Sequence, residues 1–183
     1  MQKVETPFKD LYILEPKVME DARGYFMESY NHKSLIELGI NTVFVQDNQS
    51  LSAHGVLRGL HFQNAPYAHT KLVRVLSGVI QDVVVDLRRE QDTFGKYFSI
   101  ELSATNKKQL LVPKGFAHGF LVLSQQAEIL YKCDQYYSPD YEGGIRFDDP
   151  VINISWQLSP SQFILSSKDR VLPFLSEAKF TFL

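Results

Sequence analysis

Apolar residues along the chain fall mostly into short runs of the kind that forms β-strands. Many of these runs alternate apolar with polar residues, as a strand does when one face is buried and the other meets solvent. Turn-forming residues separate the runs; Ser77-Gly78, for example, divides a long apolar stretch into two. We expect strands within the segments 10–16, 42–48, 56–63, 71–88, 96–104, 108–115, 118–124, 127–137 and 152–158.

Helical signals are few. In the segment 31–40 three apolar residues cluster on one side, Asn31 can cap the first turn, and Gly39 suits the end. A second helical turn is predicted where Ser159 precedes Pro160. Many short strands joined by turns therefore predict a mainly β, antiparallel sandwich or barrel with a few short helices.

Composition adds limits on what the protein does. The 183 residues are predicted to form one domain, 1–183, because a chain of this length can bury a sizeable core. A formal net charge of −2 gives no reason to expect nucleic acid or a membrane as a partner. The N-terminus has no signal-peptide pattern, no run approaches the ~20 apolar residues of a membrane span, and Cys133 is the only cysteine. We therefore expect a cytoplasmic protein.

The stretch "VLRGLHFQ", 56–63, places polar side chains inside an apolar strand. Regular alternation would send Arg58 and His61 to opposite faces. A bulge at Gly59 would let both face one cavity, and a buried arginine there needs an anionic partner. For His61 and His118, each beside glycine and aromatic residues, a second interpretation stays open: half-buried histidines that bond to backbone groups.

The segment 113–118, "PKGFAH", has the P-x-G-x-x-H pattern associated with the second metal motif of cupin barrels. The first motif requires H-x-H followed by a glutamate. In this chain Gln63 stands two residues after His61, and Lys71 occupies the carboxylate position. A lysine there puts positive charge where a cation would bind. We therefore predict no metal, and a cavity built around an anion or an oxyanion.

Three further positions carry possible chemistry. Tyr131 is either a core tyrosine or a proton donor that faces the cavity. Asp169 matters only if the fold returns it to His61. Arg23, followed by glycine and two aromatic residues, suits a phosphate with a sugar or base ring, or else is a surface arginine on a strand.

Taken together, several segments of the chain resemble the dTDP-4-dehydrorhamnose 3,5-epimerase family. They follow the family's order over almost the whole chain: "DARGYFMESY", "VQDNQS", "VLRGLHFQ", "KLVRVLSG", "DVVVDLRR", "TFGKY", "LLVPKGFAHGF", "LYKCDQYYSPDYEGGI" and "LSSKD". The resemblance implies a cupin-type double-stranded β-helix, or jelly-roll barrel, without metal or cofactor and usually a homodimer. It also implies the conversion of dTDP-4-dehydro-6-deoxy-D-glucose to dTDP-4-dehydro-L-rhamnose, by inversion at C3 and C5, in dTDP-L-rhamnose biosynthesis for cell-surface polysaccharide.

The resemblance also implies residue roles. His61 matches the base, Asp169 the carboxylate that orients it, Lys71 the cation beside the substrate ketone, and Tyr131 the phenol that returns a proton from the other face. The implied substrate-binding residues are Arg23, Phe26, Glu28, Gln46, Asp47, Asn48, Arg58, His118, Glu142 and Lys168. In a dimer, some of the early residues could come from the partner chain.

Other functions remain open at this stage. A relative that inverts only C3 or only C5 of another deoxysugar would use the same residues. A cupin sugar-nucleotide ketoisomerase is disfavoured because His61 and Tyr131 both stand in their epimerase motifs. A non-catalytic cupin that binds a sugar nucleotide or a metal would not need a base, a cation and an acid together.

Overall fold

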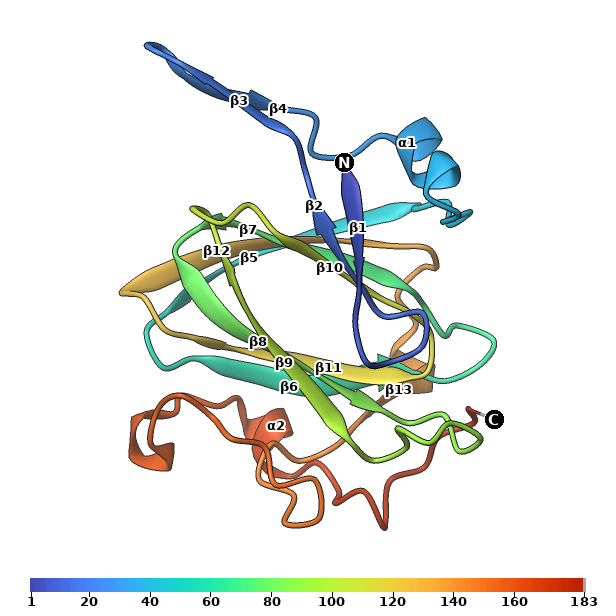
Figure 1. Ribbon diagram of the computed structural model, residues 1–183. Coiled ribbons are helices and arrows are strands. Elements are labelled where there is room, and N and C mark those ends of the chain that lie inside the picture. Colours follow the sequence, from blue (N-terminus) through green and yellow to red (C-terminus); the bar gives the residue numbers. More distant parts are fainter. Residues whose placement is uncertain (183) are drawn as a thin grey trace.

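The structure, a computed structural model, describes residues 1–182 and consists mainly of two antiparallel sheets (Figure 1). The larger sheet has the strand order β1 (Gln2–Glu5), β2 (Tyr12–Glu15), β10 (Gln109–Val112), β7 (Lys71–Ser77), β12 (Gln126–Cys133), β5 (Gln46–Ala53). The smaller sheet has the order β13 (Glu142–Gly144), β6 (Leu57–Gln63), β11 (Phe116–Val122), β8 (Val79–Asp86), β9 (Tyr97–Ser103). The fold is a jelly roll of the cupin type, as predicted.

The main hydrophobic core lies between the two sheets. Alternate residues of each strand point inward, so β7 contributes Val73 and Val75 while β8 contributes Ile80 and Val84. Helix α1 (His32–Glu37) packs Leu35 into a second cluster with Leu14, Leu72 and Leu111 of the larger sheet. The segment 145–182 covers the outer face of the smaller sheet (Figure 1). Each sheet is therefore covered on both faces over part of its area.

The predicted helical turns are present. The Asn31 side chain accepts hydrogen bonds from the amides of Lys33 and Ser34 and so caps α1. The Ser159-Pro160 signal marks a short 3-10 helix, η2 (Pro160–Gln162). A second 3-10 turn, η1 (Pro139–Tyr141), and the single-turn helix α2 (Ser167–Arg170) complete the set. No helix within residues 1–182 is long and apolar enough to cross a membrane.

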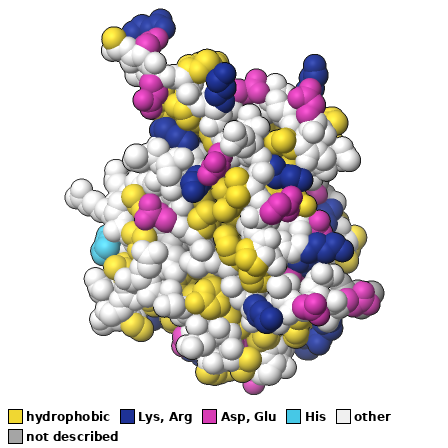
Figure 2. All heavy atoms as spheres, in the orientation of Figure 1, with side chains coloured by type: hydrophobic (Ala, Val, Ile, Leu, Met, Phe, Trp, Pro, Cys, Tyr) yellow, Lys and Arg dark blue, Asp and Glu magenta, His cyan; other side chains and the backbone are white. Residues whose placement is uncertain are grey.

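A two-stranded hairpin, β3 (Val18–Asp21) and β4 (Gly24–Met27), projects from the body of the molecule (Figures 1 and 2). Its side chains are poorly covered: Tyr25 is 54% exposed and Phe26 is 67% exposed. Met19, opposite Phe26, is 51% exposed, so the two side chains form a contiguous apolar patch of the kind found on interaction surfaces.

Two predicted strands are wrong in part or in full. The strand expected over 42–48 begins only at Gln46, because its partner β12 ends at Cys133, which lies opposite Gln46. The segment 152–158 is not a strand at all. Asn153 has a φ of 50°, and the Gln81 side chain bonds to the carbonyl of Ser155 and the amide of Gln157. A side chain thus takes the place of a neighbouring strand.

The bulge predicted at Gly59 is confirmed. On β11, His118 pairs with His61 and Phe120 pairs with Arg58, so β6 carries one extra residue between the two pairs. Gly59 itself has a φ of 123°, and a Cβ atom there would lie 2.6 Å from the Gly119 Cα. Both the backbone conformation and the close approach of β11 therefore require glycine.

We expect Gly59→Ala to lower the free energy of unfolding by roughly 2–4 kcal/mol. An unfavourable φ and the collision with β11 both contribute to this loss. Urea denaturation followed by circular dichroism measures it. Gly24→Ala is the matched control, because Gly24 has a φ of 124° but nothing within 4 Å of the added Cβ. Equal stability losses in the two variants would contradict the role given to the close approach.

Candidate active site

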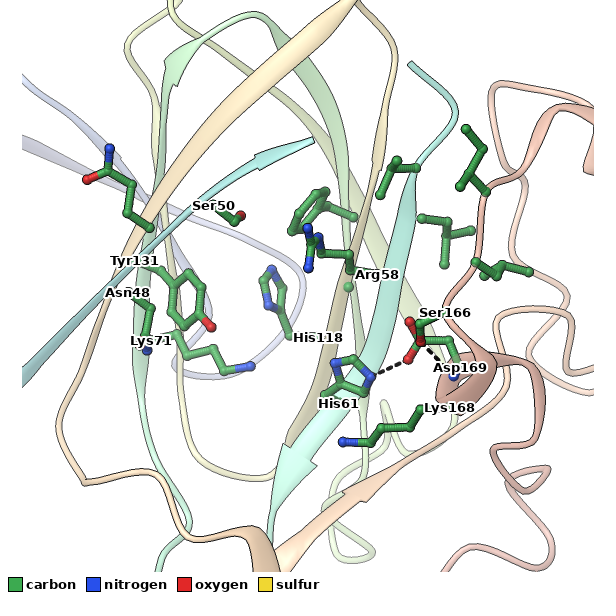
Figure 3. Close-up of a pocket in the computed structure, with 17 residues that line it drawn as sticks. Asn48, Ser50, Arg58, His61, Lys71, His118, Tyr131, Ser166, Lys168 and Asp169 are labelled. Atoms are coloured by element: carbon green, nitrogen blue, oxygen red, sulfur yellow. Dashed lines mark hydrogen bonds and ion pairs between the residues drawn. The ribbon is translucent and has the colours of Figure 1, made fainter. Parts of the chain in front are cut away.

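A cavity of about 470 Å³ lies between the two sheets (Figure 3). Strands β5, β6, β7, β11 and β12 and the segment 164–169 line it. A smaller cavity of about 90 Å³ adjoins it and shares Asn48, His61, Lys71 and Tyr131. The predicted base, cation and phenol therefore face one connected space.

His61 and Asp169 are in direct contact although they are 108 residues apart in sequence. His61 Nε2 lies 2.6 Å from Asp169 Oδ1. Asp169 sits on α2, where the Ser166 hydroxyl accepts a hydrogen bond from its amide. Backbone hydrogen bonds of Ile164 with Gly55 and Leu57 hold this segment beside β6. The fold thus returns Asp169 to His61.

The electrostatics of this pair keep Asp169 ionised. Burial raises the pKa of Asp169, but the hydrogen bonds from His61 and Ser166 and the charge of Lys168 outweigh burial, and the pKa falls below its ordinary value of 3.8. The Asp169 carboxylate accepts a hydrogen bond from His61 Nε2, which leaves Nδ1 as the ring nitrogen available to a ligand.

Lys71 enters the cavity from the opposite sheet, on β7. Its side chain is buried, and desolvation lowers the pKa of its ammonium group. Within residues 1–182, no carboxylate lies within 4 Å of the Lys71 ammonium. An unpaired ammonium beside a cavity favours an anionic ligand. The same part of the chain contains no cluster of three or more His, Cys, Asp or Glu side chains that could hold a metal ion.

Tyr131, on β12, also faces the cavity from the larger sheet (Figure 3). Its ring centroid lies 5.7 Å from the Lys71 ammonium nitrogen. Burial raises the pKa of Tyr131 above its ordinary value of 10.0, so the phenol keeps its proton near neutral pH. The geometry favours the cavity-facing interpretation of this residue over the core tyrosine.

Two more predicted residues line the larger cavity, each with a partner that the sequence analysis did not identify. Arg58 is exposed and not buried as expected, and its Nε donates to the Ser52 hydroxyl at 3.1 Å, while its two terminal nitrogens have no hydrogen-bond partner within residues 1–182. His118 Nε2 lies 2.9 Å and 3.1 Å from the two carboxylate oxygens of Asp82. The alternative that His61 and His118 bond only to backbone groups is therefore wrong, since each contacts a buried carboxylate.

The remaining cavity residues form a polar rim. Gln46 and Glu142 line the smaller cavity, and Lys168 lines the larger one. Glu142 pairs with Lys168 and accepts a hydrogen bond from the Tyr137 hydroxyl at 2.8 Å. Burial raises the pKa of Glu142, but these two hydrogen bonds bring it below its ordinary value.

Four predicted residues lie outside the cavity of this chain. The Arg23 side chain is 90% exposed and pairs with Asp21 on the projecting hairpin, which also carries the exposed Phe26. Glu28 accepts a hydrogen bond from Ser34, beside helix α1. Asp47 points away from the cavity because side chains alternate along β5, and it pairs with Lys132 at 2.9 Å.

A jelly roll that encloses a cavity lined by ionisable side chains from both sheets places this protein in the class of cupin-type proteins with a polar ligand cavity. The family model described as dTDP-4-dehydrorhamnose 3,5-epimerase matches residues 5–177. The chain therefore belongs to the dTDP-4-dehydrorhamnose 3,5-epimerase family, which confirms the resemblance found in the sequence. Its place in this family makes the protein an isomerase of dTDP-rhamnose biosynthesis.

Individual relatives agree with the family model. The chain is 50% identical over 179 residues to the dTDP-4-dehydrorhamnose 3,5-epimerase of Salmonella typhimurium, with 97% of each chain covered. The crystal structure of the corresponding Elizabethkingia anophelis enzyme has a TM-score of 0.92 and 52% identity, covering 96% of this chain and 97% of that one. The dTDP-6-deoxy-D-glucose-3,5-epimerase of Legionella pneumophila, solved in complex with dTDP-4-keto-L-rhamnose, has a TM-score of 0.92 and 46% identity, covering 96% and 93%.

His69, beside the smaller cavity, generates a prediction about stability. The Gln63 amide nitrogen lies 2.9 Å from His69 Nδ1 and donates to it, so a proton on Nδ1 would break this bond. Burial, together with the nearby Lys71 charge, lowers the pKa of His69 from 6.5 to about 3. At pH values between about 3 and 6.5, His69 binds a proton in the unfolded chain but not in the folded chain. Stability therefore falls as the pH drops below 6.5.

Between pH 7 and pH 5 we expect the wild type to lose roughly 2 kcal/mol more unfolding free energy than His69→Gln, whose side chain does not titrate. Urea denaturation at the two pH values measures the difference. His54→Gln, at an exposed position, should keep the wild-type dependence on pH. A His69→Gln protein with the same pH slope as the wild type would rule out this assignment.

Proposed function

We propose that the protein inverts both C3 and C5 of dTDP-4-dehydro-6-deoxy-D-glucose through an enolate, without a cofactor, and so yields dTDP-4-dehydro-L-rhamnose. The observation that supports this most directly is the origin of the ionisable groups. His61 belongs to the smaller sheet, whereas Tyr131 and Lys71 belong to the larger one. A sugar ring held between the sheets would have a base on one face and an acid on the other.

The proposed steps follow from the substrate's chemistry. The ketone at C4 acidifies the hydrogens on C3 and C5, because loss of either proton gives an enolate. His61 Nδ1 removes the proton, and the Asp169 carboxylate stabilises the imidazolium that forms. The Lys71 ammonium stabilises the enolate oxygen, as the donors of an oxyanion hole do. Tyr131 then protonates the carbon from the opposite face, which inverts it.

Substrate binding is assigned to the remaining cavity residues. The two terminal nitrogens of Arg58, which have no partner within the described part of the chain, suit a forked contact with a diphosphate oxygen pair. His118, Asn48, Gln46, Glu142 and Lys168 surround the rest of the space with donors and acceptors for the sugar and nucleotide. The Legionella pneumophila relative, solved in complex with dTDP-4-keto-L-rhamnose, supports a dTDP-sugar as the ligand.

The catalytic roles are tested by proton NMR of the substrate in deuterated water. We expect His61→Ala to abolish both exchange and inversion, because no base remains. Tyr131→Phe should still exchange deuterium at C3, since His61 can return it from the same face, but inversion should fall by about 100-fold or more. The wild type should incorporate deuterium at C3 and C5 with inversion of both.

Two surface variants serve as controls: His54→Gln and Tyr136→Phe, each at an exposed position, should behave as wild type. Exchange at a single carbon in the wild-type protein would favour the single-site epimerase. Tight binding with no exchange at all would leave only a sugar-nucleotide-binding protein. Normal inversion by Tyr131→Phe would move the acid role elsewhere, with Tyr137 as the next candidate.

We also infer a homodimer in which the projecting hairpin of one chain completes the nucleotide site of the other. The hairpin exposes Tyr25 and Phe26, and Arg23 is paired only with Asp21 beside it. The family resemblance assigns Arg23, Phe26 and Glu28 to substrate binding, yet none of them lines the cavity of its own chain. A contribution to the partner's cavity reconciles the two observations.

Mixing two inactive or weakened variants tests this arrangement. We expect Arg23→Ala and His61→Ala, denatured together and refolded, to regain activity. In a mixed dimer one site would have both residues intact, because each chain supplies the residue that the other lacks. Refolding each variant alone is the control and should give no gain. If Arg23 acted on the cavity of its own chain, the mixture would be no more active than the average of its components.

A further inference from the structure

The carboxylate of Asp82 is buried inside the barrel and is not used by the proposed steps. Asp82 lies in the middle of β8, on the same inward face as the core residues Ile80 and Val84, and its side chain has no exposed surface. A carboxylate in such a place costs several kcal/mol unless a donor and a positive charge compensate it. The groups around Asp82 therefore indicate what it does.

His118 is the only hydrogen-bonding partner of the Asp82 side chain within the described residues. Its Nε2 contacts both carboxylate oxygens, so this nitrogen carries a hydrogen that points at Asp82. His118 also lines the larger cavity (Figure 3). With Nε2 occupied, Nδ1 is the nitrogen that remains for a ligand in the cavity. Asp82 thus fixes both the ring orientation and the tautomer of His118.

Asp82 also acts on Lys71 from behind the cavity. Its negative charge favours the protonated ammonium and opposes the effect of burial on the pKa of Lys71. The titratable groups that surround the Lys71 ammonium are His61, His69, Asp82, His118, Tyr131, Cys133 and Glu142.

We propose that Asp82 is a positioning residue for the epimerisation: it holds His118 by Nε2 and places a buried negative charge behind Lys71 at the floor of the cavity. This proposal rests on the proposed function, in which Lys71 stabilises the enolate oxygen. Asp82 lines neither cavity and does not touch the substrate. It acts only through His118 and Lys71 in front of it.

The test is Asp82→Asn, which keeps the size of the side chain and one oxygen acceptor but removes the charge. We expect kcat to fall on the order of 10-fold to 100-fold, by analogy with the loss when hydrogen-bond partners of metal-ligating histidines are removed. The Kd for dTDP should stay within about three-fold, since Arg58 is untouched. The alkaline limb of the kcat profile should move to lower pH, because without the Asp82 charge the Lys71 ammonium loses its proton more easily.

Asp86→Asn is the matched control. Asp86 is equally buried on the same strand, but its carboxylate pairs with Arg88 and Thr93 and lines neither cavity. This variant should lose stability while its kcat and alkaline limb stay as in the wild type. The proposal is overturned if Asp82→Asn has the wild-type kcat and alkaline limb, or if Asp86→Asn changes both in the same way.

A measurement on the wild-type protein keeps the proposal testable if Asp82→Asn does not fold. The ring nitrogens of His118, labelled with 15N and assigned by comparison with His118→Gln, should show a proton on Nε2 throughout pH 6–9. A proton on Nδ1 with a bare Nε2 would overturn the proposal. Failure of the epimerisation mechanism itself is seen separately, as activity that survives in His61→Ala.

Discussion

The single added residue in β6 is the constraint on which the site depends. In a regular strand, the odd spacing between Arg58 and His61 would send one of them out of the barrel. The bulge at Gly59 restores both to the cavity while β11 keeps its pairing on either side, so that His118 still lies opposite His61. Glycine is required at this point by its φ and by the close approach of Gly119. The backbone geometry at Gly59, and not only the types of residue present, therefore brings Arg58, His61 and His118 together at the cavity.

The charges around the cavity form a pattern that the overall composition conceals. Three carboxylates each pair with one basic group: Asp169 with His61, Asp82 with His118, and Glu142 with Lys168. Lys71 and Arg58 have no carboxylate within 4 Å in residues 1–182. These two unpaired cations make the space electropositive inside a chain whose formal charge is −2. Such a space suits a ligand that carries a diphosphate and develops negative charge during its reaction.

Much of the barrel and part of the site follow from the sequence, for identifiable reasons. Alternation predicts most strands, and the conflict between alternation and the stretch 56–63 predicts the bulge. The pairing of Asp169 with His61 came only with the family resemblance, because no local pattern indicates a contact between segments so far apart. Asp82 was missed although it stands alone among valines in "GVIQDVVVD", since its diagonal contact with His118 depends on strand register. Register and side-chain partners likewise explain the errors at 42–45 and 152–158.

Because the ionisable groups are divided between two sheets, the hydrophobic core between the sheets also affects how far apart these groups lie. On β12, Tyr131 is the next inward-facing residue after Ile129. On β11, His118 is the inward-facing residue just before Phe120. Ile129 and Phe120 both belong to the hydrophobic cluster between the sheets. The volume of these side chains therefore determines the thickness of the gap that a sugar ring must fill. Substitutions in the core that leave every ionisable residue unchanged would still alter which sugar rings fit. Substrate selectivity in this fold can therefore change through core residues that do not line the cavity.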